Sequence, residues 1–210
     1  MKEPASPEAV EAWIAAASDR FDRFTNVRTA SVAHREEHGL GCTVFPTRSG
    51  PLLGVLAAAV AARRLLEVGT GLGYSALWLA FGAGPDAHVE TIEMDPLHAE
   101  LARRNLAEHG FDVHVKVHEG RALDSLSGLS APYDLVFCDA DPEQYEALLD
   151  EFLRLLRPWG LLISANLFLA QFATDIPHLD QIARYRKRIV EDDRLLTSFV
   201  PGGMALSVVR

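Results

Sequence analysis

The chain has 210 residues, of which 49% are hydrophobic and 23% charged, and its formal net charge is −9. This composition excludes extensive disorder and predicts one compact globular unit. The negative charge excludes a nucleic-acid-binding protein, which needs a basic face to displace counterions. Two cysteines are too few for a disulfide framework. No signal peptide pattern and no run of ~18 apolar residues occurs, so we expect a cytoplasmic protein without membrane contact.

The first predicted element is a helix over residues 6–24. Ser6 is a suitable N-cap and Pro7 fits the first turn. Apolar residues recur on one face of this helix, at Val10, Trp13, Ile14 and Ala17. We expect residues 1–43 to form a helical cap on a domain that spans residues 44–210, and the apolar first helix is a candidate dimer interface.

A histidine motif follows this helix. His34-Arg35-Glu36-Glu37-His38 matches the H-x-x-E-H pattern of some zinc peptidases, which places two imidazoles one helical turn apart. Glycines at positions 39 and 41 leave little helix to carry the motif, so a solvated helix or loop is the simpler interpretation. Since this segment should fold over the mouth of a site, His34 or His38 can alternatively act as a base.

Short apolar runs alternate with helical patterns from residue 65 onward. The predicted strands span residues 65–69, 88–93, 113–118, 133–139 and 160–165. The predicted helices span residues 74–81, 96–109, 143–156 and 176–190. Residues 195–200 and 204–209 form a hairpin around Pro201-Gly202-Gly203. This order predicts an α/β fold with a mostly parallel, seven-stranded sheet, an antiparallel last strand and helices on both faces.

The first of these strands ends in a glycine-rich turn, Gly69-Thr70-Gly71-Leu72-Gly73. The glycines allow close approach of the backbone to a ligand, and the amides at the start of the next helix favour a negative group. Glu93 ends the second strand, twenty residues after Gly73, where a carboxylate accepts both hydroxyls of a ribose. The turn and Glu93 together predict a nucleoside-containing cofactor.

Two classes of cofactor fit this turn. Gly71-x-Gly73-x-x-Ala76 matches the dinucleotide fingerprint and favours an NAD(P)-dependent oxidoreductase. Glu67, inside the strand end, would repel a pyrophosphate and attract the ammonium group of S-adenosylmethionine. The antiparallel hairpin and the acidic end of the fourth strand, Asp139 and Asp141, agree with S-adenosylmethionine.

Four segments in this order and spacing resemble a known family. LEVGTGLGYSALWLA, TIEMDPLHAELARRNL, YDLVFCDADPEQYEALL and LRLLRPWGLLISAN are similar to the small S-adenosylmethionine-dependent O-methyltransferases, which include catechol and caffeoyl-CoA O-methyltransferases. The resemblance covers about residues 44–209. It implies a Rossmann-like class I methyltransferase fold, methyl transfer to an oxygen of a small molecule, and a homodimer.

The resemblance also implies roles for individual residues. Glu67, Gly69 and Gly71 would line the methionyl end of the cofactor, and the amide of Tyr74 with Ser75 would hold its carboxylate. Glu93 would bind the ribose. Further cofactor positions implied by the family motifs are Val44, Met94 against the adenine, Arg121 and Ala122 at its amino edge, and Asp139.

The departures from the family pattern concern catalysis. Pro142 stands where the family has a lysine, the proposed base, and Ala165 where it has one of three metal-binding residues. Asp139 and Asn166 remain as candidate ligands of a divalent cation such as Mg²⁺. Three alternatives follow: a methyltransferase without a metal, one with a weakened metal site, and a catalytically inactive cofactor-binding protein. In the active alternatives Asp139 joins cofactor and acceptor.

Overall fold

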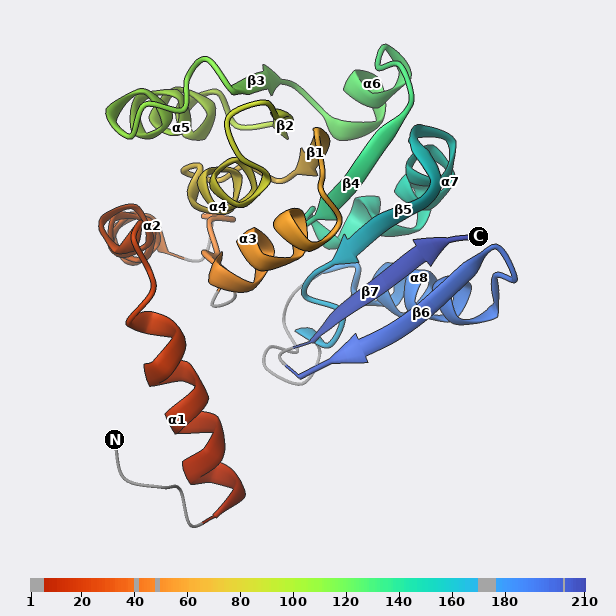
Figure 1. The fold of residues 1–210 in the computed structure, drawn as a ribbon, viewed down its shortest axis with the longest axis horizontal. Helices are drawn as coiled ribbons and strands as arrows, with labels where there is room; N and C mark the ends of the chain where they lie inside the picture. Colours follow the sequence, from red (N-terminus) through yellow and green to blue (C-terminus); the bar gives the residue numbers. More distant parts are fainter. Residues whose placement is uncertain (1–5, 40–41, 48–49, 170–176, 202) are drawn as a thin grey trace.

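The computed structural model describes residues 6–39, 42–47, 50–169, 177–201 and 203–210. Its strands form one seven-stranded sheet in the order β3-β2-β1-β4-β5-β7-β6 (Figure 1). Strands β1 to β5 pair in parallel, whereas β7 is antiparallel to both β5 and β6. The strands are β1 (Arg64–Val68), β2 (His88–Glu93), β3 (Val115–Glu119), β4 (Tyr133–Cys138), β5 (Leu156–Ser164), β6 (Leu195–Val200) and β7 (Met204–Val209). The predicted sheet is confirmed.

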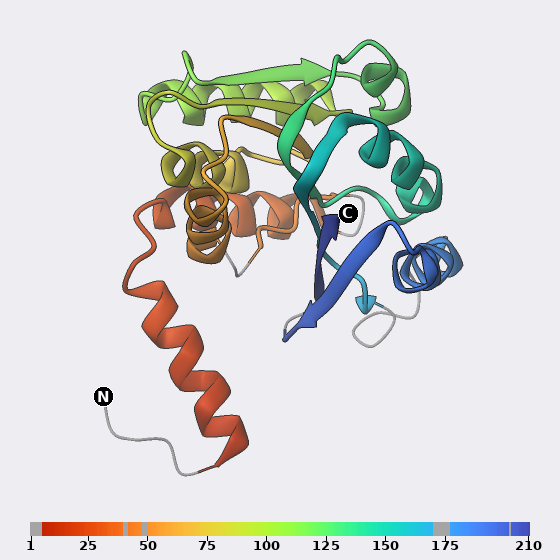
Figure 2. The same cartoon turned by 45° about the vertical axis from the view of Figure 1, so that its right-hand side comes forward.

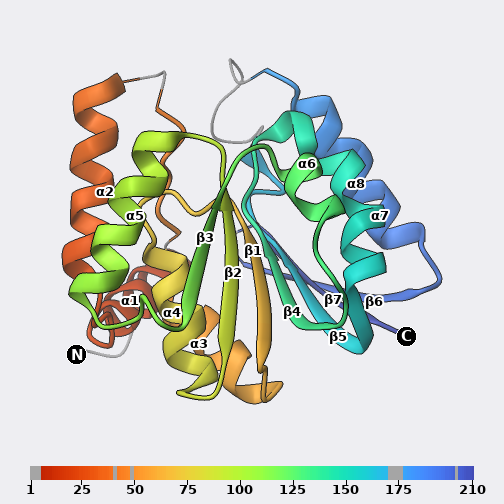
Figure 3. The ribbon, with the colours of Figure 1, turned by 90° about the horizontal axis from the view of Figure 1, so that it is seen from above.

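Helices cover both faces of this sheet, and each face has its own hydrophobic core (Figure 3). One layer consists of α2 (Thr25–His38), α3 (Gly50–Ala59), α4 (Tyr74–Ala83) and α5 (Pro96–Glu108). The other consists of α6 (Ala122–Ser127), α7 (Tyr145–Leu155) and α8 (Leu179–Glu191). Among the described residues, no helix combines the length and apolar character that crossing a bilayer requires.

The N-terminal helix is shorter than the sequence pattern predicts. The side chain of Ser6 caps α1 (Pro7–Asp19) as expected, accepting a hydrogen bond from the Ala9 amide at 3.2 Å. The chain then turns, because Asp22 accepts hydrogen bonds from the Phe24 amide at 3.2 Å and the Thr25 hydroxyl at 3.1 Å. Such local bonds compete with helix continuation. The prediction of one helix over residues 6–24 is therefore wrong.

The second helix, α2, has 14 residues and carries the whole histidine motif, so the expectation of too little helix is also wrong. Phe24, just before α2, packs edge-on against Trp78 of α4 with ring centroids 5.2 Å apart. By contrast, α1 projects away from the rest of the molecule (Figure 2). Its side chains Val10, Trp13 and Ile14 are all exposed by 40% or more.

Other boundaries differ by a few residues. Strand β5 begins four residues earlier than predicted, at Leu156, where the neighbouring Arg157 binds Asp134 of β4 with Nε and Oδ1 2.6 Å apart. A short 3₁₀ turn, η2 (Pro142–Gln144), precedes α7, and α6 had no sequence signal. The predicted start of the last helix at Ile176 lies outside the described residues, and α8 begins at Leu179.

Helices α3 and α4 touch through their backbones. A Cβ placed on Gly82 of α4 would lie 2.0 Å from the carbonyl oxygen of Gly54 in α3. A Cβ on Gly54 would in turn lie 3.0 Å from the Trp78 ring. The two glycines therefore set the distance between these helices, and α4 begins at the glycine-rich turn.

We expect Gly82→Ala to lower the free energy of unfolding by about 1–3 kcal/mol, the usual cost of overpacking a core. Alanine otherwise favours a helix by roughly 1 kcal/mol over glycine, so the sign itself is informative. Urea unfolding measures the change. Gly128→Ala is the control, because a Cβ there makes only an ordinary contact, 3.6 Å from the Ser125 carbonyl oxygen. Equal stabilities of the two variants would contradict the close helix contact.

Candidate functional site

The glycine-rich turn brings the ends of β1 and β4 into direct contact. Gly69 has φ +92°, and a Cβ there would lie 2.2 Å from the carbonyl oxygen of Asp139. The Asp139 amide donates to the Val68 carbonyl at 2.8 Å. Gly73, with φ +90°, is the N-cap of α4. The first amides of α4 have no acceptor within the helix, so they are suited to bind an anionic group.

Glu67 is a buried carboxylate directly before this turn. Its Oε2 accepts a hydrogen bond from the Thr91 hydroxyl at 2.5 Å, and that hydroxyl contacts the Thr70 hydroxyl at 2.6 Å. Within the described part of the chain, Oε1 has no hydrogen-bond partner. Burial raises the pKa of Glu67 to about 8, although the hydrogen bond from the Thr91 hydroxyl favours the charged form. The site thus presents an unsatisfied acceptor, which suits a cationic or hydrogen-bond-donating group.

Glu93 is also buried, at the end of β2. Its Oε2 accepts from the Gly71 amide at 2.8 Å and its Oε1 from the Asp95 amide at 3.0 Å. Burial raises its pKa, and the nearby carboxylates Asp95 and Asp141 act in the same direction. A carboxylate has about four lone-pair positions, so both oxygens can accept further hydroxyl groups.

The remaining predicted cofactor positions surround these two carboxylates. The Gly120 amide donates to the Glu93 carbonyl at 2.9 Å, which brings Arg121 and Ala122 to the end of β2. The Arg121 side chain is exposed and pairs with Glu143 at 3.1 Å, while Ala122 is buried. Across the turn, Val44 is buried with Cys42 and Leu72.

The predicted residues therefore lie together along the carboxyl ends of the parallel strands, which we call the cofactor edge of the sheet. Positions at the carboxyl ends of β1 to β4 or in the following turns are Glu67, Gly69, Gly71, Tyr74, Ser75, Glu93, Met94, Arg121, Ala122 and Asp139. Met94 is 40% exposed beside Glu93. In doubly wound sheets this edge is where ligands bind.

Asp139 lies between this edge and the end of β5. The Asn166 amide donates a hydrogen bond to Asp139 Oδ1, so the structure brings both candidate metal ligands together. Burial, followed by the charge of Asp141, raises the pKa of Asp139 to about 7. A carboxyl group with a pKa near neutrality can accept or donate a proton under physiological conditions.

The donors around Asp139 do not fit a divalent-cation site held by three protein ligands. Ala165 contributes a buried methyl group, and Pro142 has no side-chain donor. Within the described ranges, the only His, Cys, Asp and Glu residues that bring three ligand atoms within 4.8 Å of one another are His34, Cys42 and His98. One carboxylate and one amide remain at Asp139, whereas Mg²⁺ sites rely on carboxylate charge.

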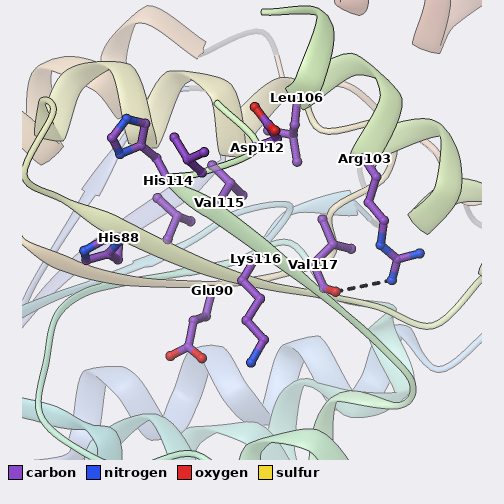
Figure 4. A pocket seen from close by; sticks show the side chains of 11 residues that line it. His88, Glu90, Arg103, Leu106, Asp112, His114, Val115, Lys116 and Val117 are labelled. Atoms are coloured by element: carbon purple, nitrogen blue, oxygen red, sulfur yellow. Dashed lines mark hydrogen bonds between the residues drawn. The ribbon is translucent and has the colours of Figure 1, made fainter. Parts of the chain in front are cut away.

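A separate cleft of about 650 Å³ lies beside β3, the outermost strand on one side of the sheet (Figure 4). Its walls include His88 and Glu90 from β2 and Lys116 from β3. These positions lie toward the amino ends of β2 and β3, at the opposite end of the strands from Glu93. The cleft is therefore not part of the site at the glycine-rich turn.

One neighbour of the site, His98, has no spacing signal in the sequence. His98, in the first turn of α5, is buried with its Nδ1 3.9 Å from Glu93 Oε1. Its Nε2 lies 3.2 Å from His34 Nε2. Burial and the charges of His38 and His98 lower the pKa of His34. Thus His34, one of the two candidate bases, faces the Glu93 side of the site.

A doubly wound sheet with a reversed β7, a glycine-rich turn and buried carboxylates at two strand ends defines a protein of the class I methyltransferase type. The family model of O-methyltransferases matches residues 24–210. The chain belongs to the O-methyltransferase family. The predicted family resemblance is confirmed.

Individual relatives agree with this family. A catechol O-methyltransferase of Mycobacterium tuberculosis is 46% identical over 138 residues, which are 65% of this chain and 63% of that protein. The cofactor-bound structure of Rv0187 from MTB has a TM-score of 0.80 and 32% identity, with 99% of both chains covered. TomG of Streptomyces achromogenes, an O-methyltransferase of tomaymycin synthesis solved with S-adenosylmethionine, has a TM-score of 0.73 and 32% identity, covering 87% of this chain and 88% of TomG.

Proposed function

We propose that this protein transfers a methyl group from S-adenosylmethionine to an oxygen of a small molecule without using a metal ion. The observation that carries the cofactor assignment is the buried Oε1 of Glu67 beside the glycine-rich turn, for which the described residues offer no hydrogen-bond partner. An ammonium group can donate a hydrogen bond to this acceptor, whereas an ionised pyrophosphate has no proton to donate to it. Family membership favours the same cofactor over NAD(P).

In this proposal each end of the cofactor has its own partners. Glu67 faces the ammonium group directly or through a water molecule, and the first amides of α4 with the Ser75 hydroxyl hold the carboxylate. Glu93 accepts the ribose hydroxyls. The other binding positions are Val44, Gly69, Gly71, Tyr74, Met94, Arg121, Ala122 and Asp139. TomG, which was solved with S-adenosylmethionine, supports the assignment as a relative.

The proposed chemical role of Asp139 is to position the acceptor hydroxyl and take its proton. Bound S-adenosylmethionine supplies a methyl group on a sulfonium, a leaving group that needs no acid. Asn166 fixes the orientation of the Asp139 carboxylate through their hydrogen bond. A folded-state pKa of about 7 leaves Asp139 ionised, and so able to accept the proton, above that pH.

We expect methyl transfer to a panel of phenols and catechols to be unchanged by EDTA or added Mg²⁺. Asp139→Asn should lower kcat by about 10²–10⁴-fold, the usual contribution of a general base. Radiolabelled methyl incorporation measures both effects. Asp141→Asn is the matched control: it should retain activity with a pH profile shifted to lower pH, because removing its charge lowers the pKa of Asp139.

Three outcomes would contradict this proposal. Loss of activity with EDTA and its recovery with Mg²⁺ would indicate a retained metal site at Asp139 and Asn166. Binding of S-adenosylmethionine without transfer to any acceptor would favour the catalytically inactive alternative. Binding of NADH in its place would overturn the cofactor assignment.

The Glu67 carboxyl predicts a pH dependence of cofactor binding. Since its pKa is about 8 without ligand, it is mostly neutral below that pH and must lose a proton to pair with an ammonium group. The affinity for S-adenosylmethionine should therefore rise by up to about tenfold per pH unit as the pH approaches 8. Calorimetric titration from pH 6 to 9 measures this dependence. In Glu67→Gln the affinity should be lower and the difference from wild type should grow with pH; parallel curves would contradict the pairing.

We further propose that the protein is a homodimer in the cytoplasm, with a second copy covering α1. The exposed Val10, Trp13 and Ile14 form an apolar helix face, which a monomer would leave in contact with water. The two free thiols, Cys42 and Cys138, suit a reducing compartment. Sedimentation should show a dimer for the full chain and a monomer for Trp13→Glu/Ile14→Glu. Phe21→Glu, outside α1, is the control; identical dimers in all three would place the interface elsewhere.

A further inference from the structure

Three side chains with nitrogen or sulfur donors converge beside the cofactor edge, from three separate parts of the chain. His34 comes from α2, Cys42 from the segment that follows it, and His98 from the first turn of α5. One ligand atom from each residue lies within 4.8 Å of the other two. Cys42 and His98 are buried, and His34 is partly buried.

The geometry fits a tetrahedral metal ion. The two imidazoles face each other with Nε2 atoms 3.2 Å apart. Two nitrogens bound to Zn²⁺ at 2.0–2.1 Å with tetrahedral angles lie roughly 3.3–3.4 Å apart, so little movement of either ring is needed. A thiolate and two imidazoles are ligands that Zn²⁺ prefers and Mg²⁺ does not. Three protein ligands leave the fourth position to water.

The second nitrogen of His98 supports this assignment. Among the described residues, the buried Nδ1 has no hydrogen-bond partner, and it lies 3.9 Å from Glu93 Oε1. Ligating histidines usually direct their other N–H to a carboxylate, which orients the ring and increases its basicity. A metal on Nε2 places the proton on Nδ1, on the side of Glu93.

The histidine motif of the sequence takes part in a different way from the one its spacing suggests. His38 does not join His34 as a ligand: its Nδ1 donates to the His34 carbonyl at 2.8 Å, and the two rings stack with centroids 4.1 Å apart. His34 instead faces His98, 64 residues further along the chain. The peptidase arrangement is therefore absent from α2, and the donor set is completed by tertiary contacts.

We propose that His34, Cys42 and His98 form a Zn²⁺ site that fastens α2 and the following segment to α5 beside the cofactor-binding edge. The site is independent of the oxygen donors at Asp139 and Asn166. Two of the ligands lie close in sequence to proposed cofactor-binding residues, which a metal would therefore help to hold in place. Cys42 is two residues before Val44 and is buried with it, and His98 follows Glu93 by five residues. Metal binding would hold both segments in place before the cofactor arrives.

The test uses the full-length chain, stripped of metals, and Co²⁺ as a spectroscopic probe for Zn²⁺. We expect one equivalent of Co²⁺ to bind with a thiolate-to-cobalt charge-transfer band and the strong visible absorption of a tetrahedral site. Zn²⁺ should displace it and raise Tm. Cys42→Ser should abolish the charge-transfer band. His98→Asn and His34→Asn should lower the affinity by at least about 10–100-fold, the loss that even a second-shell substitution causes.

Three matched controls keep the result specific. Cys138→Ala removes the other thiol, Asp139→Asn alters the separate oxygen-donor site, and His88→Asn removes an exposed histidine; all should bind Co²⁺ like wild type. His34 is the least buried of the three ligands, so His34→Asn is the ligand substitution that should disturb folding least. No saturable binding by wild type, or equal binding by wild type and the His34 and Cys42 variants, would show that the two imidazoles merely share a hydrogen bond. Because the readout is metal binding and Tm, it does not depend on whether the protein transfers methyl groups.

Discussion

The burial of Glu67 at the end of β1 is the constraint on which the functional edge depends. Moving a carboxylate out of water is costly unless it is paired, and here one oxygen is left without a partner among the described residues. Since the folded-state pKa of about 8 exceeds the ordinary 4.5, the folded state binds more protons between these values, and this group makes folding less favourable as the pH rises through that window. A fold that keeps such a group has a use for the unsatisfied oxygen.

The glycine-rich turn makes this burial possible. Because Gly69 has no Cβ, β1 can end against the backbone of Asp139, and the carboxyl ends of β1, β2 and β4 meet without an intervening side chain. The same turn places the Gly71 amide on Glu93 and starts α4. One local feature therefore brings three carboxylates and a helix N-terminus to the same end of the sheet.

Features with a local cause could be predicted from the sequence. Strands β2, β6 and β7 have the predicted bounds, since apolar runs and turn residues determine them, and the residues of the glycine-rich turn reach the same edge because parallel strands order their ends. Features that depend on tertiary contacts could not. The break after α1 depends on one Asp22 side chain, the start of β5 on the Arg157–Asp134 pair, and the meeting of His34 with His98 on the packing of two helices.

The two sides of the cofactor edge offer different kinds of ligand atom: oxygen on one side, nitrogen and sulfur on the other. On the β4 and β5 side, Pro142 and Ala165 carry no side chain that could act as a base or a metal ligand, and Asp139 forms a hydrogen bond with Asn166. On the β2 and α5 side, nitrogen and sulfur donors gather next to Glu93. In the proposed binding mode, an oxygen site close to the acceptor acts on the hydroxyl that reacts, whereas a nitrogen and sulfur site beside Glu93 is separated from that hydroxyl by the cofactor. In that binding mode, we infer that a metal beside Glu93 acts by stabilising the binding site, and that Asp139 directs the acceptor by its own charge.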